Sequence, residues 1–202
     1  MLYRILMLLA FSAPALADEA EDLHSLLAAT DHLAAKFSQQ QFDETGQMID
    51  ASTGSMALQK PNLVRWHILD PFEQLLLGDG YWLWQYDVEL AQVVRRPYPD
   101  DTSQTPLLVF AESLASLRTN YSVSRNDEAC YVLSPNDDAS LFASMTLCFD
   151  DTLLSRFVLL DGFGQRTVVS LYEVSQDLLP PDRFAFDLPG EAELIIDDGY
   201  VR

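Results

Sequence analysis

The fold is constrained most by a run of alternating side chains at residues 62–69. Val64, Trp66 and Ile68 occupy one set of alternating positions, while Arg65 and His67 occupy the other. Because successive side chains of a β-strand point to opposite faces of a sheet, this spacing predicts a strand with one strongly apolar face. Asp70-Pro71 then predicts the end of the strand.

A second alternating run lies close by in the chain. Leu75 to Leu77 form an apolar segment before a predicted turn at 78–80, and Trp82, Trp84 and Tyr86 alternate after it. All three tryptophans of the chain therefore lie between residues 60 and 92, a stretch without an evident catalytic motif. This composition indicates a surface that holds an apolar ligand.

The second half of the chain also predicts mainly β-structure. Phe157 and Leu159 share one face of a predicted strand, and Arg156, Val158 and Leu160 share the other. The predicted strands cover residues 121–125, 129–134, 141–149, 153–160, 166–174, 183–187 and 194–196.

Two segments have helical spacing instead. Apolar residues recur mostly every three or four positions over 18–42, with Thr30-Asp31 as a candidate cap for a second helical segment. Residues 106–117 have a proline in the first turn and one apolar face made by Leu107, Phe110, Leu114 and Leu117. Both segments are predicted to be helical. For the second, core packing explains the apolar face at least as well as ligand contact does.

The first 17 residues have the pattern of a secretory signal peptide. Arg4 precedes an apolar run over 5–11, and Ala15-Leu16-Ala17 forms a small-x-small cleavage site. The run is shorter than the roughly 20 residues that cross a bilayer, so we expect cleavage after Ala17 and a soluble single domain over 18–202. Asp18 stands where a lipid-anchored protein would carry cysteine, which predicts a freely diffusing protein.

The charge of the chain limits its partners. The formal net charge is −19 at pH 7, and loss of Arg4 on cleavage would make it more negative. Such a chain is repelled by nucleic acid and by anionic lipid headgroups, so nucleic acid is excluded as a partner. The acidic residues favour a soluble monomer and suit docking to basic surfaces on partner proteins.

The two cysteines are candidates for a disulfide in an oxidising compartment. Cys130 and Cys148 flank a turn-prone Pro135-Asn136-Asp137-Asp138 segment, so they could face each other across a β-hairpin. Redox catalysis is not expected, because no C-x-x-C pair is present.

No enzyme motif is apparent. His24, His32 and His67 lack the spacing and the cysteine partners of a zinc site, and the sequence has no G-x-S-x-G turn, phosphate-binding loop or dinucleotide fingerprint. Acid pairs at 100–101, 137–138 and 150–151 are interpreted as solvated loop residues rather than a calcium site. We predict a binding protein without a catalytic residue, metal or cofactor.

An ordered set of short motifs resembles the periplasmic outer-membrane lipoprotein carrier proteins, the LolA family. No single motif is specific, but together they span the mature chain in the order of the family. They are Lys60-Pro61-Asn62-Leu63, Trp66, Pro71, Asp79-Gly80, Leu83-Trp84, Tyr86, Gln92, Thr105-Pro106-Leu107-Leu108, Tyr131-Val132-Leu133-Ser134-Pro135, Gly164-Gln165-Arg166-Thr167 and Phe184-Ala185-Phe186-Asp187-Leu188-Pro189.

The resemblance implies a mainly β α+β fold, a half-open antiparallel β-barrel with a helical lid over an apolar cavity. It implies a chaperone that shields the acyl chains of outer-membrane lipoproteins in the periplasm. Cargo would arrive from an inner-membrane ABC transporter of the LolCDE type and leave to an outer-membrane acceptor of the LolB type. The candidate cavity residues are Val64, Trp66, Ile68, Leu76, Trp84, Leu107, Phe110, Leu114 and Phe157.

Lys60 is where the chain departs from this family. The family usually has arginine here, resembling a latch that donates hydrogen bonds to the lid, and lysine lacks the planar five-donor fork of arginine. A solvent-facing lysine beside Pro61 is the structural alternative. Two other functions stay open: a periplasmic module of the same fold that senses lipid or lipoprotein, and the membrane-anchored acceptor, which Asp18 opposes.

Overall fold

The computed structural model describes residues 18–98, 109–110, 112–137, 140 and 142–197. Within these residues, twelve strands form one continuous sheet, which confirms the predicted mainly β fold. The predicted signal peptide, residues 1–17, lies outside them. No helix in the described part of the chain is long and apolar enough to cross a membrane.

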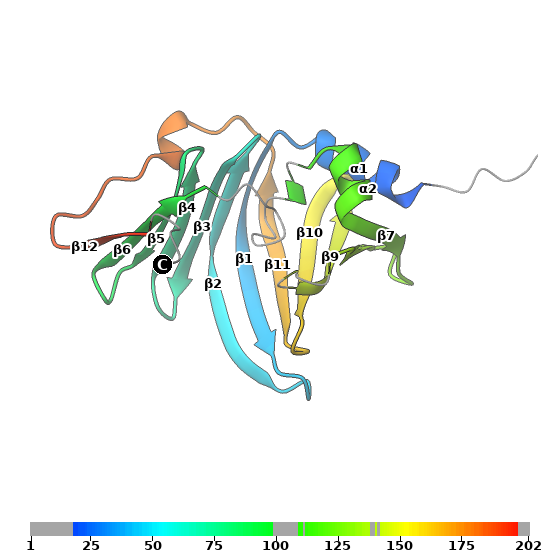
Figure 1. Ribbon diagram of the computed structural model, residues 1–202, viewed down its shortest axis with the longest axis horizontal. Helices are drawn as coiled ribbons and strands as arrows, with labels where there is room; N and C mark the ends of the chain where they lie inside the picture. Colours follow the sequence, from blue (N-terminus) through cyan, green and yellow to red (C-terminus); the bar gives the residue numbers. More distant parts are fainter. Residues whose placement is uncertain (1–17, 99–108, 111, 138–139, 141, 198–202) are drawn as a thin grey trace, which may run out of the picture.

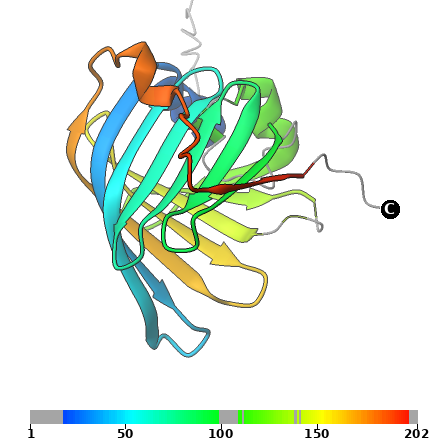
Figure 2. The same ribbon diagram turned by 90° about the vertical axis from the view of Figure 1, so that its left-hand side faces the viewer.

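The sheet curves strongly, so that its concave face forms the inside of an incomplete barrel (Figures 1 and 2). The strand order is β12-β6-β5-β4-β3-β2-β1-β11-β10-β9-β8-β7, and all neighbours are antiparallel except β12 and β6. The elements are α1 (Glu19–Ala28), β1 (His32–Phe42), β2 (Met48–Gln59), β3 (Leu63–Asp70), β4 (Gln74–Asp79), β5 (Trp82–Asp87), β6 (Gln92–Pro97), α2 (Leu114–Asn120), β7 (Tyr121–Arg125), β8 (Tyr131–Pro135), β9 (Phe142–Asp150), β10 (Leu153–Asp161), β11 (Arg166–Ser175), the 3-10 helix η3 (Pro181–Phe184) and β12 (Glu193–Ile196).

The strand at 62–69 is confirmed, together with its two faces. Trp66 of β3 pairs with Met56 of β2 on one side and with Leu76 of β4 on the other. Directly paired residues share a face of the sheet, so all three lie on the concave face with Val64 and Ile68. The predicted separation of Phe157 and Leu159 from Arg156 and Val158 is also confirmed, because the first two line a concave pocket and the others a convex one.

The predicted helix over 18–42 is wrong beyond its first ten residues. α1 ends at Ala28, and the chain continues as β1, which pairs along nearly its whole length with β2 and β11. Thr30 does not cap a second helix; its hydroxyl donates to the Leu26 carbonyl at 3.2 Å. Leu33, Ala35 and Phe37 are all buried, which is the spacing of two expected for a strand. Pairing with strands on both sides stabilises this conformation over the helix that the sequence also allowed.

Two further predictions need correction. Within the described residues, 106–117 is not one helix: Val109 and Phe110 form a short 3-10 turn, and α2 begins only at Leu114, where the Ser113 side chain caps it. The strand predicted at 183–187 is absent, because this segment forms the end of η3 and an extended coil. Pro180 and Pro181 favour a helix that begins here, since proline suits the first turn of a helix.

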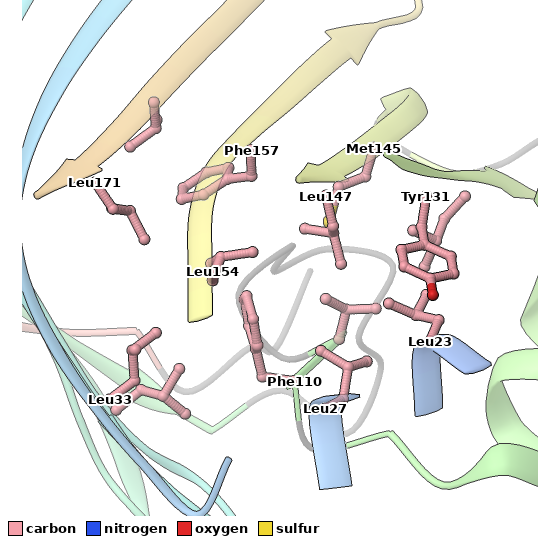
Figure 3. Packing of buried hydrophobic residues seen from close by; sticks show 14 of the residues in the cluster. Leu23, Leu27, Leu33, Phe110, Tyr131, Met145, Leu147, Leu154, Phe157 and Leu171 are labelled. Carbon is pink, nitrogen blue, oxygen red and sulfur yellow. The ribbon is translucent and has the colours of Figure 1, made fainter. Parts of the chain in front are cut away.

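The main core fills the concave face beneath the helices. Figure 3 shows Leu23 and Leu27 of α1 directed into the same apolar layer as Leu147, Leu154 and Phe110. All five side chains are buried. The core therefore joins the helices to the strands on both sides of β1.

A separate layer covers the convex face of β3 to β6. Residues 181–196 cross this face and end as β12 along the edge of β6 (Figure 2). Leu77 is completely buried although it points away from the concave core, and Phe184 of η3 is also buried. The C-terminal segment thus gives this half of the sheet apolar packing on both faces.

Candidate functional site

An apolar pocket of about 180 Å³ lies in the middle of the concave face. Its walls come from five strands on the two sides of the curved sheet, so the curvature itself creates the hollow. The lining residues are Gln39 of β1, Trp66 of β3, Leu76 of β4, Phe157 and Leu159 of β10, and Thr167 and Val169 of β11.

Three aromatic rings pack together at this pocket, and two of them, Trp66 and Phe157, line it. Phe37 stacks on Trp66 with ring centroids 3.9 Å apart and planes 17° apart, and Phe157 meets Trp66 edge to face at 6.0 Å. Gly54 makes the stack possible, because a Cβ there would lie 2.7 Å from the Phe37 ring and 2.0 Å from the His67 carbonyl oxygen. The rings therefore depend on a glycine that sequence reasoning did not single out.

Helix α1 closes the upper end of the concave face (Figure 1). The Asp18 carboxylate caps its N-terminus by accepting hydrogen bonds from the Ala20 and Glu21 amides. Leu23 and Leu27, one turn apart, are buried against the core, while most of the opposite side is polar and exposed. This helix has the amphipathic character of a lid.

Ion pairs attach the N-terminal end of α1 to its neighbours. Arg118 of α2 pairs with Asp18, and its guanidinium group lowers the pKa of that carboxyl below the usual value. Arg125 of β7 pairs with Glu19 at 3.2 Å. Because these side chains are largely exposed, solvent screens both pairs and they contribute little to stability.

Lys60 attaches the C-terminal end of α1 to the sheet. Its ammonium group donates a hydrogen bond to the Leu27 carbonyl oxygen at 2.6 Å. The last carbonyls of a helix carry partial negative charge, so a cation is favoured there. Burial lowers the pKa of Lys60 below its usual value, and the nearby Asp31 opposes that shift. The side chain is therefore a half-buried tether to α1 rather than a lysine that only faces solvent.

The sequence-predicted cavity residues take different positions. Trp66, Leu76 and Phe157 line the pocket. Val64 and Phe110 are buried, and Ile68 packs against the main core. Leu114 is half-buried at the start of α2, and Leu107 lies outside the described residues.

Trp84 does not belong to the cavity. It pairs with Leu77, which places it on the convex face, where its ring stacks on Phe186 at 4.8 Å. Its indole Nε1 donates to the Asp79 carboxylate at 2.8 Å. Burial raises the pKa of Asp79, but hydrogen bonds from Trp84 and from the backbone amides of Trp82 and Tyr81 outweigh that effect and lower it overall. Alternation separated the two faces correctly but could not tell which one was covered by the C-terminal segment.

Cys130 and Cys148 form a disulfide beside the β8–β9 pairing, where the predicted hairpin placed them. Arg156 lies next to the bridge, with its guanidinium 3.4 Å from the Cys148 Sγ, and pairs with Glu128. The bridge lies away from the residues that line the concave pocket.

Sequence reasoning missed four pocket residues: Gln39, Leu159, Thr167 and Val169. The sequence held a signal for two of them. Leu159 was already placed on the face of Phe157, and Gln39 follows Phe37 at a spacing of two. The second signal was hidden because residues 32–42 were predicted to be helical.

Comparison with known proteins adds an independent observation. The family model described as outer membrane lipoprotein carrier protein LolA matches residues 28–187. An outer-membrane lipoprotein carrier protein from Azotobacter vinelandii is 33% identical over 203 residues, covering 96% of this chain and 98% of that protein. One from Pseudomonas aeruginosa is 30% identical over 177 residues, covering 86% and 85%.

Solved structures share the fold at low identity. An uncharacterized conserved protein from Thermus thermophilus aligns with a TM-score of 0.55 and 15% identity, over 88% of this chain and 99% of that chain. A LolA superfamily protein from Nitrosomonas europaea aligns with a TM-score of 0.51 and 13% identity, over 84% and 99%. The family match and the sequence relatives place this chain in the LolA family of outer-membrane lipoprotein carrier proteins.

Proposed function

We propose that this protein shields the acyl chains of lipoproteins in its concave cavity and carries them through the periplasm. The observation that carries the proposal is the apolar, aromatic-walled pocket of about 180 Å³, which is continuous with a larger apolar core beneath a separately tethered helix. The membership of the chain in a lipoprotein carrier family supports the nature of the cargo.

The physical need for shielding follows from the hydrophobic effect. Each acyl methylene moved out of water gains about 0.8 kcal/mol, so ten methylenes left in water would cost about 8 kcal/mol. A carrier must offset most of this cost without binding more tightly than the membrane that receives the cargo. Val64, Trp66, Ile68, Leu76 and Phe157 supply the concave apolar wall for that purpose.

The pocket is smaller than a loaded cavity must be. Ligand sites for drug-sized molecules occupy about 300–1,000 Å³, and the pocket holds about 180 Å³. Leu23, Leu27 and Phe110 fill the adjacent space. Loading therefore requires α1 and Phe110 to move out, and Lys60 is the latch that opposes the movement of α1.

The cargo route follows from the same role. After cleavage behind Ala17, the mature domain 18–202 works as a periplasmic monomer and as a binding protein rather than an enzyme, without metal or cofactor. It receives acylated outer-membrane lipoproteins from an inner-membrane ABC transporter of the LolCDE type. It delivers them to an outer-membrane acceptor lipoprotein of the LolB type.

Mass spectrometry of protein purified from the periplasm tests this function. The wild-type protein should carry acylated lipoproteins, and Leu76→Glu, which puts a charge into the pocket, should carry none. Leu69→Glu is the matched control, because Leu69 is 54% exposed and should tolerate the same change.

The outcome also separates the carrier from the sensing module. Free lipid, bound in place of lipoprotein, would favour the sensor. Equal lipoprotein loads on Leu76→Glu and the wild type would refute the cavity as the binding site.

A further inference from the structure

A second pocket lies on the convex face of the sheet and has a volume of about 290 Å³. Its lining residues are Arg65 of β3, Pro180, and Asp182 and Arg183 of η3. Arg65 pairs across the strands with Ala57 and Leu77, and both of these neighbours are completely buried. Phe184 is buried as well, which anchors η3 against β3 and β4 (Figure 2). The pocket is therefore built between two anchored elements.

The two arginines in this pocket have no counterion among the described residues. Arg65 is half-buried and Arg183 is exposed, and within the described part of the chain neither guanidinium group makes a hydrogen bond or an ion pair. Four other basic side chains do pair with carboxylates: Lys36, Arg118, Arg125 and Arg156. The chain has 31 Asp and Glu against 12 Lys and Arg, so two unpaired arginines in one pocket are unexpected.

The two positive charges act on each other. Burial lowers the pKa of Arg65 below its usual value, and the positive charge of Arg183 lowers it further. Asp182 lines the same pocket, but its carboxylate forms no ion pair with either arginine in the part of the chain that the structure describes. The pocket therefore has an excess of positive charge, which an anion bound between the two guanidinium groups would offset.

The chemistry of the lining groups indicates which anion fits. A guanidinium group presents a planar fork of donors that matches the oxygens of phosphate and carboxylate. A phosphate monoester offers three terminal oxygens, enough to face two forks, whereas a carboxylate offers two. Asp182, when ionised, only accepts hydrogen bonds, so it favours a ligand with a hydroxyl or ammonium group beside the phosphate. A volume of about 290 Å³ leaves room for such a group.

We propose that Arg65 and Arg183 bind the phosphate group of a small phosphate monoester, while Asp182 accepts a hydrogen bond from a hydroxyl or ammonium group of the same molecule. Phosphoethanolamine is the simplest ligand of this class. The net charge of −19 opposes longer polyanions such as nucleic acid. The site is independent of the proposed acyl cavity, because it lies on the opposite face of the sheet.

Ligand binding would also fasten the C-terminal segment, residues 181–196. Arg65 belongs to the sheet, and Arg183 belongs to η3 at the start of this segment. A phosphate group between them replaces a repulsion with a bridge, so the segment should open less often when the ligand is bound. Hydrogen exchange over residues 181–196 should therefore slow when phosphoethanolamine is added to the wild type, and should not change in Arg183→Gln.

Isothermal titration calorimetry with phosphoethanolamine tests the site directly. Wild-type protein should bind one equivalent, about two- to fivefold more tightly than inorganic phosphate, because Asp182 meets the ammonium group at an exposed position. Arg65→Gln and Arg183→Gln should each weaken binding at least tenfold, since each removes charge-assisted hydrogen bonds. Arg96→Gln is the matched control: it removes the same charge from an exposed arginine on the concave face of β6 and should bind as the wild type does.

Asp182→Asn tests the second half of the proposal. Asp182 is exposed, so this variant should fold normally, bind phosphate as the wild type does and lose the preference for phosphoethanolamine. Wild-type affinity in Arg65→Gln and Arg183→Gln, or no binding by the wild type, would overturn the site. So would binding to vesicles of phosphatidylethanolamine without binding to phosphoethanolamine, because the ligand would then be a lipid diester. Each of these failures leaves the carrier function standing.

Discussion

Replacing Lys60 with leucine should loosen the lid. The Lys60 ammonium donates a hydrogen bond to the Leu27 carbonyl oxygen at 2.6 Å. Because Lys60 directly follows β2, this hydrogen bond joins the sheet to the last turn of α1. Lys60→Leu removes the donor and the charge but keeps most of the apolar stem. The core contacts of Leu23 and Leu27 are not changed, so the effect should concern the docking of α1 rather than the fold.

The size of the effect follows from the geometry. A hydrogen bond to a charged group contributes about 1.5–3 kcal/mol. Lysine is only partly buried here, and the Leu27 oxygen also accepts from the Thr30 amide at 3.0 Å, so it is not left without a partner. We therefore expect Lys60→Leu to weaken the docking of α1 by about 1–1.5 kcal/mol. This corresponds to a five- to twelvefold larger population of molecules with α1 undocked.

Hydrogen exchange of the α1 amides measures this population directly. Protection over Glu19–Ala28 should fall by the same factor, and an apolar ligand should bind up to that much more tightly, because closure competes with binding. Tighter retention should in turn slow transfer of lipoprotein to the acceptor. Lys36→Leu is the control, since it removes the same charge from an exposed ion pair with Glu173. Equal α1 exchange in both variants, or transfer rates identical to wild type, would refute the latch.

Three other perturbations separate the parts of the molecule. Gly54→Ala should lower the free energy of unfolding by about 1–3 kcal/mol in urea denaturation, because its Cβ has no room, whereas Gly162→Ala should be nearly neutral since nothing lies within 4 Å. Trp84→Ala should increase proteolysis after residue 180 without changing acyl-ligand affinity, and Trp66→Ala should weaken that affinity; the reverse pattern would contradict the assignment of faces. Asp79→Asn should cost about 1 kcal/mol near neutral pH. Since the pKa of Asp79 is lowered from 3.8, that contribution is present above this value and is lost as the pH falls through the folded-state pKa, so denaturation curves of variant and wild type should converge in acid.

Local alternation predicted more of the structure than helical spacing did. Alternation of apolar residues at every second position correctly placed Val64, Trp66 and Ile68 on one face of the sheet. It also correctly placed Phe157 and Leu159 on one face. Such a pattern is reliable because a slip by one residue would turn every apolar side chain to the opposite face. Over 32–42 both periods fitted the sequence, and only pairing with β2 and β11 decides between them.

The errors of the site prediction come from contacts between distant segments. Trp84 looked equivalent to Trp66, but its covering residue is Phe186, about a hundred positions later. The run Leu75 to Leu77 already indicated that the second face is covered, because consecutive apolar residues are typical of a strand buried on both faces. Lys60 was found only through resemblance to a family, since a lone lysine before proline has no local signal for its contact with Leu27.

The central pairing of β1 with β11 has a consequence for the speed of folding. Lys36 and Glu173, which form an ion pair across these two strands, are 137 positions apart in the chain. Apart from β12, which pairs in parallel with β6, each half of the sheet is a series of neighbouring hairpins that can form locally, but their junction must wait until nearly the entire polypeptide is present. Closure of such a long loop is slow, so topology predicts a late, rate-limiting step in which the two halves meet. Before that step the apolar concave face is open to water, and the chain is at its most prone to aggregation.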